Sequence, residues 1–297
     1  MPLLDSLKKG HSYGMEEQMV KQLFISDLDG TLLNENIEVS DYTKKVLNEL
    51  TKKGLEFSIA TARSAASVGC ILDGISMKYP IVLMNGAMVY NLETKKYIKV
   101  AYMKEKQVEW IAECMHRFDI TGFAYSVKNH QLITYYEEIR TKGQRAFYEE
   151  RVNRYHKKFT RISHFSDLTK EGIAYFCITG PKEKLEPLFW ELKKEEELNF
   201  AYYEDIYSDD LWYLEIFSKE ASKYHAVEFL REYTHADYIT GFGDNLNDLP
   251  LFQACDKKIA VSNAKQELKE AADEIILSNK EDGVAKYLLN CFCDKID

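Results

Sequence analysis

The stretch Leu23-Phe24-Ile25-Ser26-Asp27-Leu28-Asp29-Gly30-Thr31 places an apolar run directly before two aspartates and a Gly-Thr turn. This pattern predicts a buried strand that ends in a tight loop, with two carboxylates presented where the strand stops. Burying uncompensated charge costs free energy, and a divalent cation is the simplest compensation for two anions. The stretch therefore predicts a metal site at the end of a buried strand.

Three later segments supply the other groups that a metal-assisted phosphoryl transfer would use. A second strand-like run, Phe57-Ser58-Ile59-Ala60-Thr61, ends in a hydroxyl. Ser222 and Lys223 open a segment with apolar residues at helical spacing. The apolar run 238–240 leads into Gly243-Asp244-Asn245-Leu246-Asn247-Asp248. Carboxylates, a hydroxyl, an ammonium and an amide are thus each expected at the end of a strand or the start of a helix.

The fold class predicted from this rhythm is α/β, with a doubly wound parallel Rossmann-like sheet core and an inserted α+β cap domain. Strands and helices alternate from Leu23 to Gly86 and again after Ser218, which implies parallel pairing with right-handed crossovers. Ligands of such sheets bind beyond the carboxyl ends of the strands. With the strand order 3-2-1-4-5-6, Asp27 and Asp244 become neighbours at that edge.

The segment between the two halves is too long for a loop and carries its own pattern of strands and helices. We therefore predict three regions: a disordered N-terminal extension over 1–20, a catalytic core over 21–87 and 218–297, and a cap over 88–217. Within the cap, strands are expected at 96–102, 121–126, 132–136, 173–179, 199–203 and 211–216, and helices at 104–118, 138–156 and 182–197.

Composition agrees with a cytoplasmic metabolic enzyme. The chain has 39 basic and 48 acidic residues and a formal charge of -9, which disfavours nucleic acid or an anionic membrane as a partner. No apolar run approaches the roughly 20 residues of a membrane-spanning helix. The six cysteines are scattered through a chain of 297 residues, a pattern typical of free cytosolic thiols.

On these motifs the chain resembles the haloacid dehalogenase (HAD) superfamily of phosphatases, and within it the Cof-type branch (subclass IIB, C2B cap). The resemblance rests on four motifs and on the Asn-Gly-Ala segment at 85–87. It departs from the family pattern at Ala62 and Tyr224, where glycine is usual. Ala62 is expected to crowd a backbone N–H near the phosphate, and Tyr224 to narrow the floor of the pocket. The motifs are Asp27-Leu28-Asp29-Gly30-Thr31-Leu32-Leu33, Thr61-Ala62-Arg63, Ser222-Lys223 and Gly243-Asp244-Asn245-Leu246-Asn247-Asp248.

The resemblance implies a role for each of these residues. Asp27 would be the nucleophile that forms an aspartyl-phosphate, and Asp29 the acid and base. Mg²⁺ would be held by Asp27, the backbone carbonyl of Asp29, and Asp244. Asp248 would steady Lys223 or a metal-bound water, and Arg63 is expected to be exposed at the rim and is not assigned a role. The phosphate-binding groups would be the side chains of Thr61, Lys223 and Asn247 and backbone N–H groups near Leu28, Gly30 and Ala62.

The predicted function is hydrolysis of a small phosphorylated metabolite, such as a sugar phosphate or a similar phosphomonoester, by a monomer or weak homodimer. Two alternatives stay open. A phosphomutase or phosphotransferase would use the same phosphoaspartate but protect it from water. A non-catalytic phosphometabolite-binding regulator would keep the fold and lose turnover, and its expected mark would be the loss of Asp29 or Lys223, both of which are present. Taken singly, each motif also fits ordinary turn or cap chemistry.

Overall fold

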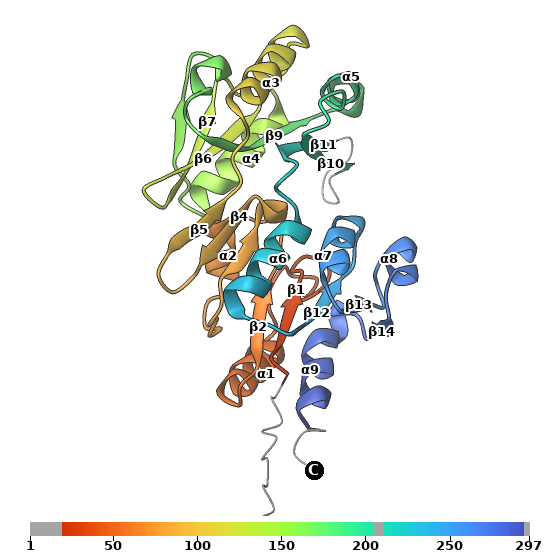
Figure 1. Cartoon of the computed structure of the whole chain (residues 1–297). Coiled ribbons are helices and arrows are strands. Elements are labelled where there is room, and N and C mark those ends of the chain that lie inside the picture. The colour runs from red at the N-terminus through yellow and green to blue at the C-terminus, as the bar shows by residue number, and fades with distance from the viewer. Residues whose placement is uncertain (1–19, 205–210, 294–297) are drawn as a thin grey trace, which may run out of the picture.

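The computed structural model describes residues 20–204 and 211–293. Figure 1 shows two parts stacked one above the other, with both ends of the described chain in the lower part and the intervening segment in the upper part. We call these parts the core and the cap. The predicted disordered extension over 1–20 lies outside the described residues, apart from Val20.

A parallel sheet forms the centre of the core. Its order is β14-β13-β12-β1-β2, and each neighbouring pair is parallel. Ala60, directly after β2, makes a parallel bridge with Val82 of β3, which extends the order by one strand. The predicted order 3-2-1-4-5-6 is therefore confirmed. The strands are β1 (Gln22–Ser26), β2 (Glu56–Ile59), β3 (Ile81–Leu83), β12 (Tyr238–Gly243), β13 (Lys257–Val261) and β14 (Glu274–Ile276).

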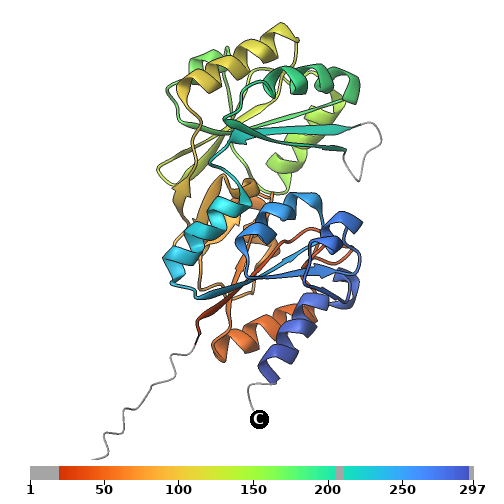
Figure 2. The ribbon, with the colours of Figure 1, turned by 45° about the vertical axis from the view of Figure 1, so that its right-hand side comes forward.

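Helices cover both faces of this sheet, as a doubly wound fold requires. Figure 2 shows α1 and α9 on one face and α6 and α7 on the other. Because both faces are covered, every residue of β1 after Gln22 is buried. The helices are α1 (Asp41–Lys52), α2 (Ala65–Ile71), α6 (Lys223–Thr234), α7 (Leu249–Ala254), α8 (Gln266–Glu270) and α9 (Gly283–Cys293).

A serine cap fixes the point at which α6 begins. The Ser222 hydroxyl accepts a hydrogen bond of 3.1 Å from the backbone N–H of His225, which satisfies one of the donors left free at a helix start. Lys223 is therefore the first residue of the helix, and its side chain is buried in the core.

A small antiparallel sheet joins the core to the cap. Strands β4 (Met88–Asn91) and β5 (Lys96–Val100) pair with β3 in the order β3-β4-β5. Strand β4 was not expected from the sequence, and the cap was expected to begin at residue 88. Because both strands extend a pairing that begins in the core, we propose that the boundary lies after Val100.

The cap is built on a second sheet, with the order β10-β11-β9-β6-β7-β8. All neighbouring strands are antiparallel except β7 and β8. The strands are β6 (Phe123–Lys128), β7 (Gln131–Tyr136), β8 (Phe159–Arg161), β9 (Ile173–Gly180), β10 (Leu198–Glu204) and β11 (Trp212–Ser218), and the helices are α3 (Glu105–Arg117), α4 (Lys142–Asn153) and α5 (Lys182–Leu192).

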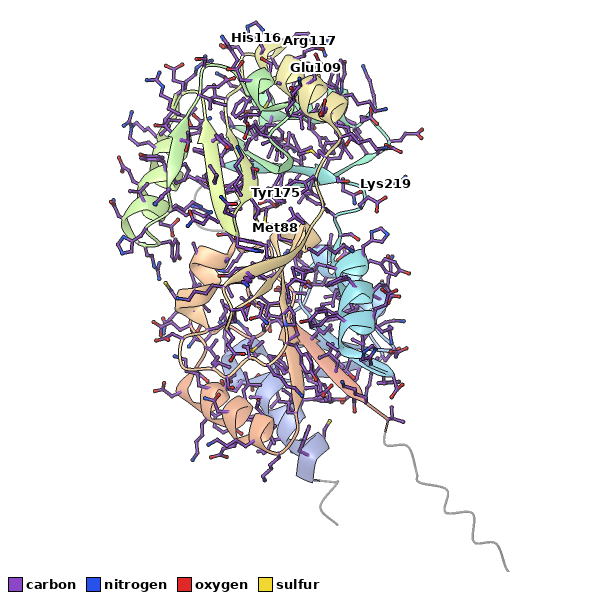
Figure 3. All side chains as sticks on the ribbon, turned by 60° about the vertical axis from the view of Figure 1, so that its left-hand side comes forward. Met88, Glu109, His116, Arg117, Tyr175 and Lys219 are labelled. Carbon is purple, nitrogen blue, oxygen red and sulfur yellow. The ribbon has the colours of Figure 1, made fainter. Side chains whose placement is uncertain are left out.

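The two faces of the cap sheet have different neighbours. Residues of α3 and α5 share a hydrophobic cluster with one face. The other face packs against α4, where the Phe147 ring stacks on Phe123 at 4.7 Å, and continues into the cluster that fills the core. Tyr175 of the cap and Met88 of β4 belong to this shared cluster, and Figure 3 labels both near the junction of the two parts. The cap thus presents one face of its sheet to the core.

Candidate active site

The site lies at the carboxyl ends of β1 and β12, which are paired side by side. The backbone N–H of Asp27 donates to the carbonyl of Phe242 at 2.9 Å. Asp27 therefore lies where the pairing of the two strands ends. Asp244 directly follows β12. The strand order therefore brings together carboxylates that are 217 positions apart in the sequence, as the topology predicted.

Asp27 is buried, with 5% of its surface exposed, and its carboxylate is bonded to the Lys223 ammonium at 2.6 Å. Burial raises the pKa of Asp27 well above its ordinary value, and the nearby carboxylates of Asp248, Asp244 and Asp29 raise it further. The charge of Lys223 acts in the opposite direction. The ionised form of Asp27, which a nucleophile needs, therefore depends on positive charge in the site.

Lys223 is shared between two carboxylates. Its ammonium lies 2.6 Å from an oxygen of Asp27 and 2.6 Å from an oxygen of Asp248, and the residue is 1% exposed. Burial by itself lowers the pKa of Lys223, but the charges of Asp248 and Asp27 outweigh it and raise the pKa overall. The ammonium is therefore a fixed positive charge beside Asp27.

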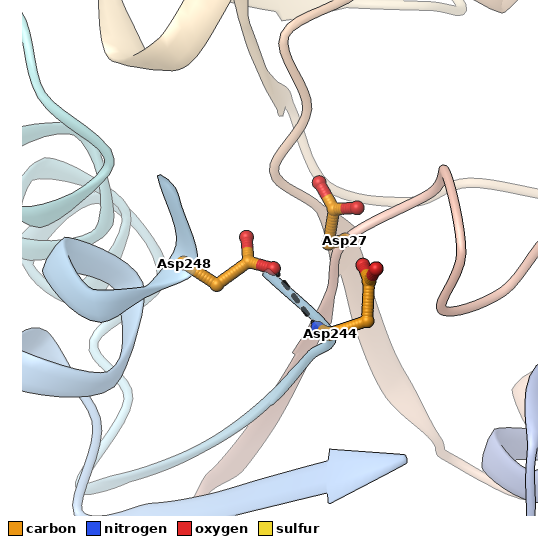
Figure 4. Close-up of side chains that lie close together, drawn as sticks. All are labelled: Asp27, Asp244 and Asp248. Carbon is orange, nitrogen blue, oxygen red and sulfur yellow. Dashed lines mark hydrogen bonds between the residues drawn. The ribbon is translucent and has the colours of Figure 1, made fainter. Parts of the chain in front are cut away.

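Asp248 and Thr31 fix the orientation of Asp244. The second oxygen of Asp248 accepts hydrogen bonds from the backbone N–H groups of Asp244 and Asn245, at 3.0 and 3.1 Å. The Thr31 hydroxyl donates to the Asp244 carboxylate at 2.9 Å. Figure 4 shows the carboxylates of Asp27, Asp244 and Asp248 gathered around one space. Burial and the charge of Asp248 raise the pKa of Asp244 to about 7.

These carboxylates fit a hard divalent cation. Among the described residues, Asp27, Asp244 and Asp248 each offer an oxygen, and the three oxygens lie within 4.8 Å of one another. Gly30 leaves room beside them, since a Cβ on this residue would lie 2.4 Å from a carboxylate oxygen of Asp244. Mg²⁺ prefers such oxygen ligands. Asp248 was predicted to steady Lys223 or a metal-bound water; its carboxylate is ion-paired with Lys223 and also lies within reach of a metal.

Arg63 differs from the expectation that it would be exposed at the rim. Its side chain is 19% exposed, and its guanidinium holds Asp29 in a two-point ion pair, with distances of 2.7 Å from Nε and 2.5 Å from Nη2. Such paired contacts match the planar guanidinium to a carboxylate. The expectation was wrong because the backbone places residue 63 in the loop next to Asp29, where the long side chain turns inward.

The predicted phosphate-binding residues are distributed around the same strand ends. Thr61 is buried after β2, and its hydroxyl accepts from the Arg63 N–H at 3.2 Å. Leu28 is buried, and its carbonyl accepts from the N–H groups of residues 31–33, which closes the loop that contains Gly30. Ala62 is half-buried. Asn247 is exposed and has no polar partner among the described residues, so its phosphate contact stays a prediction.

Tyr224 does not narrow the floor of the site. Its side chain is 36% exposed, and its ring contacts that of His225 at 5.3 Å. The first turn of α6 directs Lys223 inward and the next residue outward, because successive helix residues point about 100° apart. A large residue is therefore accommodated at this position without crowding the carboxylates.

A group of buried polar side chains that was not expected from the sequence joins the cap to the core. The side-chain amide of Asn85 donates to Glu215 of β11 at 3.2 Å and to the Tyr175 hydroxyl at 3.3 Å, and all three residues are buried. Burial raises the pKa of Glu215 to about 7, while hydrogen bonds from Tyr175 and Tyr203 oppose this shift. The only sequence signal was the Asn-Gly-Ala segment, which carried no assigned role.

The backbone of this junction also positions Lys223. Gly86 has φ +97°, and a Cβ there would lie 2.1 Å from the carbonyl group of Ser222 and 2.7 Å from the backbone nitrogen of Lys223. Only glycine combines this conformation with so close an approach. The loop after β3 is thus packed directly against the start of α6.

Gly86→Ala is therefore expected to destabilise the protein more than Gly54→Ala. Both residues have φ +97°, but nothing lies within 4 Å of a Cβ at Gly54. The unfavourable backbone conformation costs about 1–2 kcal/mol at either position, and the steric overlap at Gly86 adds roughly 1–3 kcal/mol. Urea unfolding of both variants measures the difference. If the two variants lost the same free energy of unfolding, the close packing of Gly86 against the start of α6 would be contradicted.

The fold and the site together define a doubly wound α/β protein with an acidic centre at the carboxyl ends of its strands. The chain belongs to the haloacid dehalogenase-like hydrolase family, whose model matches residues 24–288. The family predicted from the motifs is thereby confirmed. Among the described residues no helix is long and apolar enough to cross a membrane. The cysteines at 70, 114, 177, 255 and 291 are free.

Known proteins of this family resemble the chain over nearly its whole length. Phosphatase YwpJ of Bacillus subtilis (strain 168) is 28% identical over 290 residues, which cover 90% of this chain and 100% of that protein. TM0651 from Thermotoga maritima, whose crystal structure is known, is 26% identical in sequence, and the two structures match with a TM-score of 0.74. The match covers 92% of this chain and 97% of TM0651. The subclass IIB sugar phosphatase BT4131 shares the fold at 18% identity, with a TM-score of 0.67 and coverage of 91% and 98%.

Proposed function

We propose that this protein is a Mg²⁺-dependent phosphatase that hydrolyses a small phosphorylated metabolite through an aspartyl-phosphate at Asp27. The observation that carries the proposal is the buried group of Asp27, Lys223 and Asp248, with Asp244 beside it. A buried carboxylate next to a fixed ammonium and further carboxylates suits attack on a phosphoryl group once a cation is present. The naming of relatives such as YwpJ as phosphatases agrees with this reaction class.

In the first step, an oxygen of Asp27 attacks phosphorus and the bond from phosphorus to the ester oxygen breaks. Asp29 gives its proton to the departing oxygen. In the second step, Asp29 takes a proton from water, the water oxygen attacks phosphorus, and the bond to Asp27 breaks to release phosphate. Arg63 is bonded to both oxygens of Asp29 in this structure, so in the proposed mechanism Asp29 leaves this ion pair when it carries the proton.

The remaining groups bind the phosphoryl oxygens and the cation. Lys223 contributes positive charge, and Thr61 and the backbone N–H groups of the loop that contains Gly30 contribute donors. The cation would be held by Asp27, Asp244 and the carbonyl of Asp29, with Asp248 nearby. When bound, it would neutralise charge that otherwise repels the phosphate dianion.

Removal of the cation is expected to abolish turnover. Without it, the carboxylates of Asp27, Asp29, Asp244 and Asp248 repel the substrate, and the pKa values of Asp27 and Asp244 stay raised. Phosphate release from p-nitrophenyl phosphate should disappear in EDTA and return with excess Mg²⁺. Mg²⁺ alone should also raise the thermal unfolding temperature, because it binds only the folded state.

Calcium is the control for this experiment. Its larger and looser coordination is expected to misplace Asp27, so Ca²⁺ should stabilise the fold yet inhibit turnover. Full activity in EDTA would contradict the proposed role of the metal.

A further inference from the structure

Two positively charged side chains, those of Lys157 and Arg151, lie on the face of the cap sheet that is directed toward the core. Lys157 follows α4 and is half-buried, and its ammonium lies 5.0 Å from the centre of the Tyr125 ring. Among the described residues no carboxylate forms an ion pair with it. Arg151, in the last turn of α4, accepts a backbone hydrogen bond of 3.0 Å from the N–H of Lys157. The two positive side chains therefore arise from one tight turn.

Arg151 does not neutralise its neighbour, and its own partners lie on α4. Its guanidinium stacks on the Phe147 ring at 3.3 Å and donates to the carboxylate of Glu150 at 3.0 Å. Burial, together with the charge of Arg151, lowers the pKa of Lys157 to about 7. A half-buried ammonium beside a guanidinium is unfavourable unless an anion joins them.

Glu215 is a buried carboxylate on this face, and three side chains already donate hydrogen bonds to it. It accepts from Asn85 and from the hydroxyls of Tyr175 and Tyr203, and no ion pair joins it to Lys157. Arg151 is already paired with Glu150, whereas the anion that would balance Lys157 is not supplied by the described part of this chain.

The cationic turn is connected to the proposed catalytic centre at two points. Tyr155, within the same turn, interacts with the Arg63 guanidinium, which holds Asp29. On the other side, the Tyr125 ring contacts the Tyr175 ring at 6.0 Å, and the Tyr175 hydroxyl accepts from Asn85, whose backbone N–H donates to the carbonyl of Thr61. Lys157 thus belongs to the lining between the cap sheet and the phosphoryl site.

We infer that Lys157 and Arg151 form a subsite for a second anionic group on the leaving part of the substrate. This inference rests on the proposed phosphatase function and narrows its substrate to phosphate monoesters that carry a further carboxylate or phosphate. An anion between the two side chains would receive charge-assisted hydrogen bonds from both and would compensate the unpaired ammonium. The phosphoryl group that is cleaved would lie at Asp27, and the second anion would lie under the cap.

Competition against p-nitrophenyl phosphate tests the inference, because it measures binding whether or not the competitor is hydrolysed. One pair of competitors, 3-phosphoglycerate and glycerol 3-phosphate, differs by a carboxylate. A second pair, fructose 1,6-bisphosphate and fructose 6-phosphate, differs by a phosphate. In at least one pair the member with the second anionic group should bind about tenfold more tightly, the scale of a hydrogen bond to a charged group. The pair that shows the difference identifies the anion.

Lys157→Met should remove this preference, and Lys157→Arg should retain it. Lys158→Met is the matched control, because Lys158 is exposed and adjacent, and it should leave the preference unchanged. Circular dichroism verifies that each variant is folded. If wild-type protein binds the two members of each pair equally well, or if Lys157→Met keeps the preference, the inference is wrong.

Failure of the proposed function gives a different result. If wild-type protein with Mg²⁺ does not turn over p-nitrophenyl phosphate, the phosphatase proposal fails. Titration calorimetry with the same four compounds then still measures whether the second anion contributes to binding through Lys157.

Discussion

Asp27→Asn is expected to reduce phosphatase turnover by roughly 10⁵–10⁶-fold, the scale at which loss of a catalytic nucleophile acts. The amide has nearly the same shape as the carboxylate, but its oxygen is a poor nucleophile and cannot form the phosphoenzyme. The fold should survive, because removing one of several crowded carboxylates relieves the repulsion that raises the pKa of Asp27 and Asp244. The measurement is phosphate release under saturating Mg²⁺.

The control for this variant is Asp73→Asn, which makes the same chemical change at an exposed position. Its turnover should equal that of the wild type. Loss of a group that only transfers a proton lowers the rate by about 10²–10⁴-fold. If Asp27→Asn retained more than about a hundredth of the wild-type rate, its loss would be no larger than that, and Asp27 would not be the nucleophile.

Lys223→Met is expected to damage both stability and activity. The substitution keeps the length of the side chain but leaves Asp27 and Asp248 buried without their shared cation. Breaking a buried ion pair in this way costs about 3–5 kcal/mol. Without the ammonium, the pKa of Asp27 should rise further, so that less of the nucleophile is ionised at neutral pH. Loss of a charged donor to the phosphoryl group lowers turnover by about 10²–10³-fold.

Urea unfolding in EDTA measures the stability of this variant, and phosphate release with excess Mg²⁺ measures its activity. Lys219→Met, at an exposed position shortly before α6, is the control and should change neither. Mg²⁺ should recover part of the stability of Lys223→Met, because the cation supplies positive charge to the same carboxylates. If Lys223→Met were as stable as the wild-type protein in EDTA, the ion pairs of Lys223 with Asp27 and Asp248 would not contribute to the stability of the fold.

The core could be predicted from sequence because its strands are buried on both faces. Runs such as Leu23-Phe24-Ile25 are apolar without interruption, and each is followed by polar residues where the strand ends. Once the strand order was assumed, Asp27 and Asp244 had to meet at one edge of the sheet. The cluster of these two residues with Asp248 then follows from topology and not from any single motif.

Contacts that depend on side-chain paths or on the placement of the cap could not be predicted. Arg63 reaches Asp29 only through the conformation of the loop after β2. Asn85 and Glu215 are 130 positions apart and meet because the cap sheet lies over the core. Strand β8 (Phe159–Arg161) was missed because it is short and largely polar, so its pattern does not distinguish a strand from a loop.

The central claim is that Asp27 carries the phosphoryl group, and trapping it in Asp29→Asn tests this claim most directly. With an activated aryl phosphate the first step needs little help from an acid, whereas attack by water still needs a base. The variant should therefore release a burst of phenolate and accumulate one phosphoryl group per chain, with intact mass and peptide mapping placing it on Asp27. A phosphoryl group on any other residue, or a phosphorylated Asp27→Asn protein, would contradict the account.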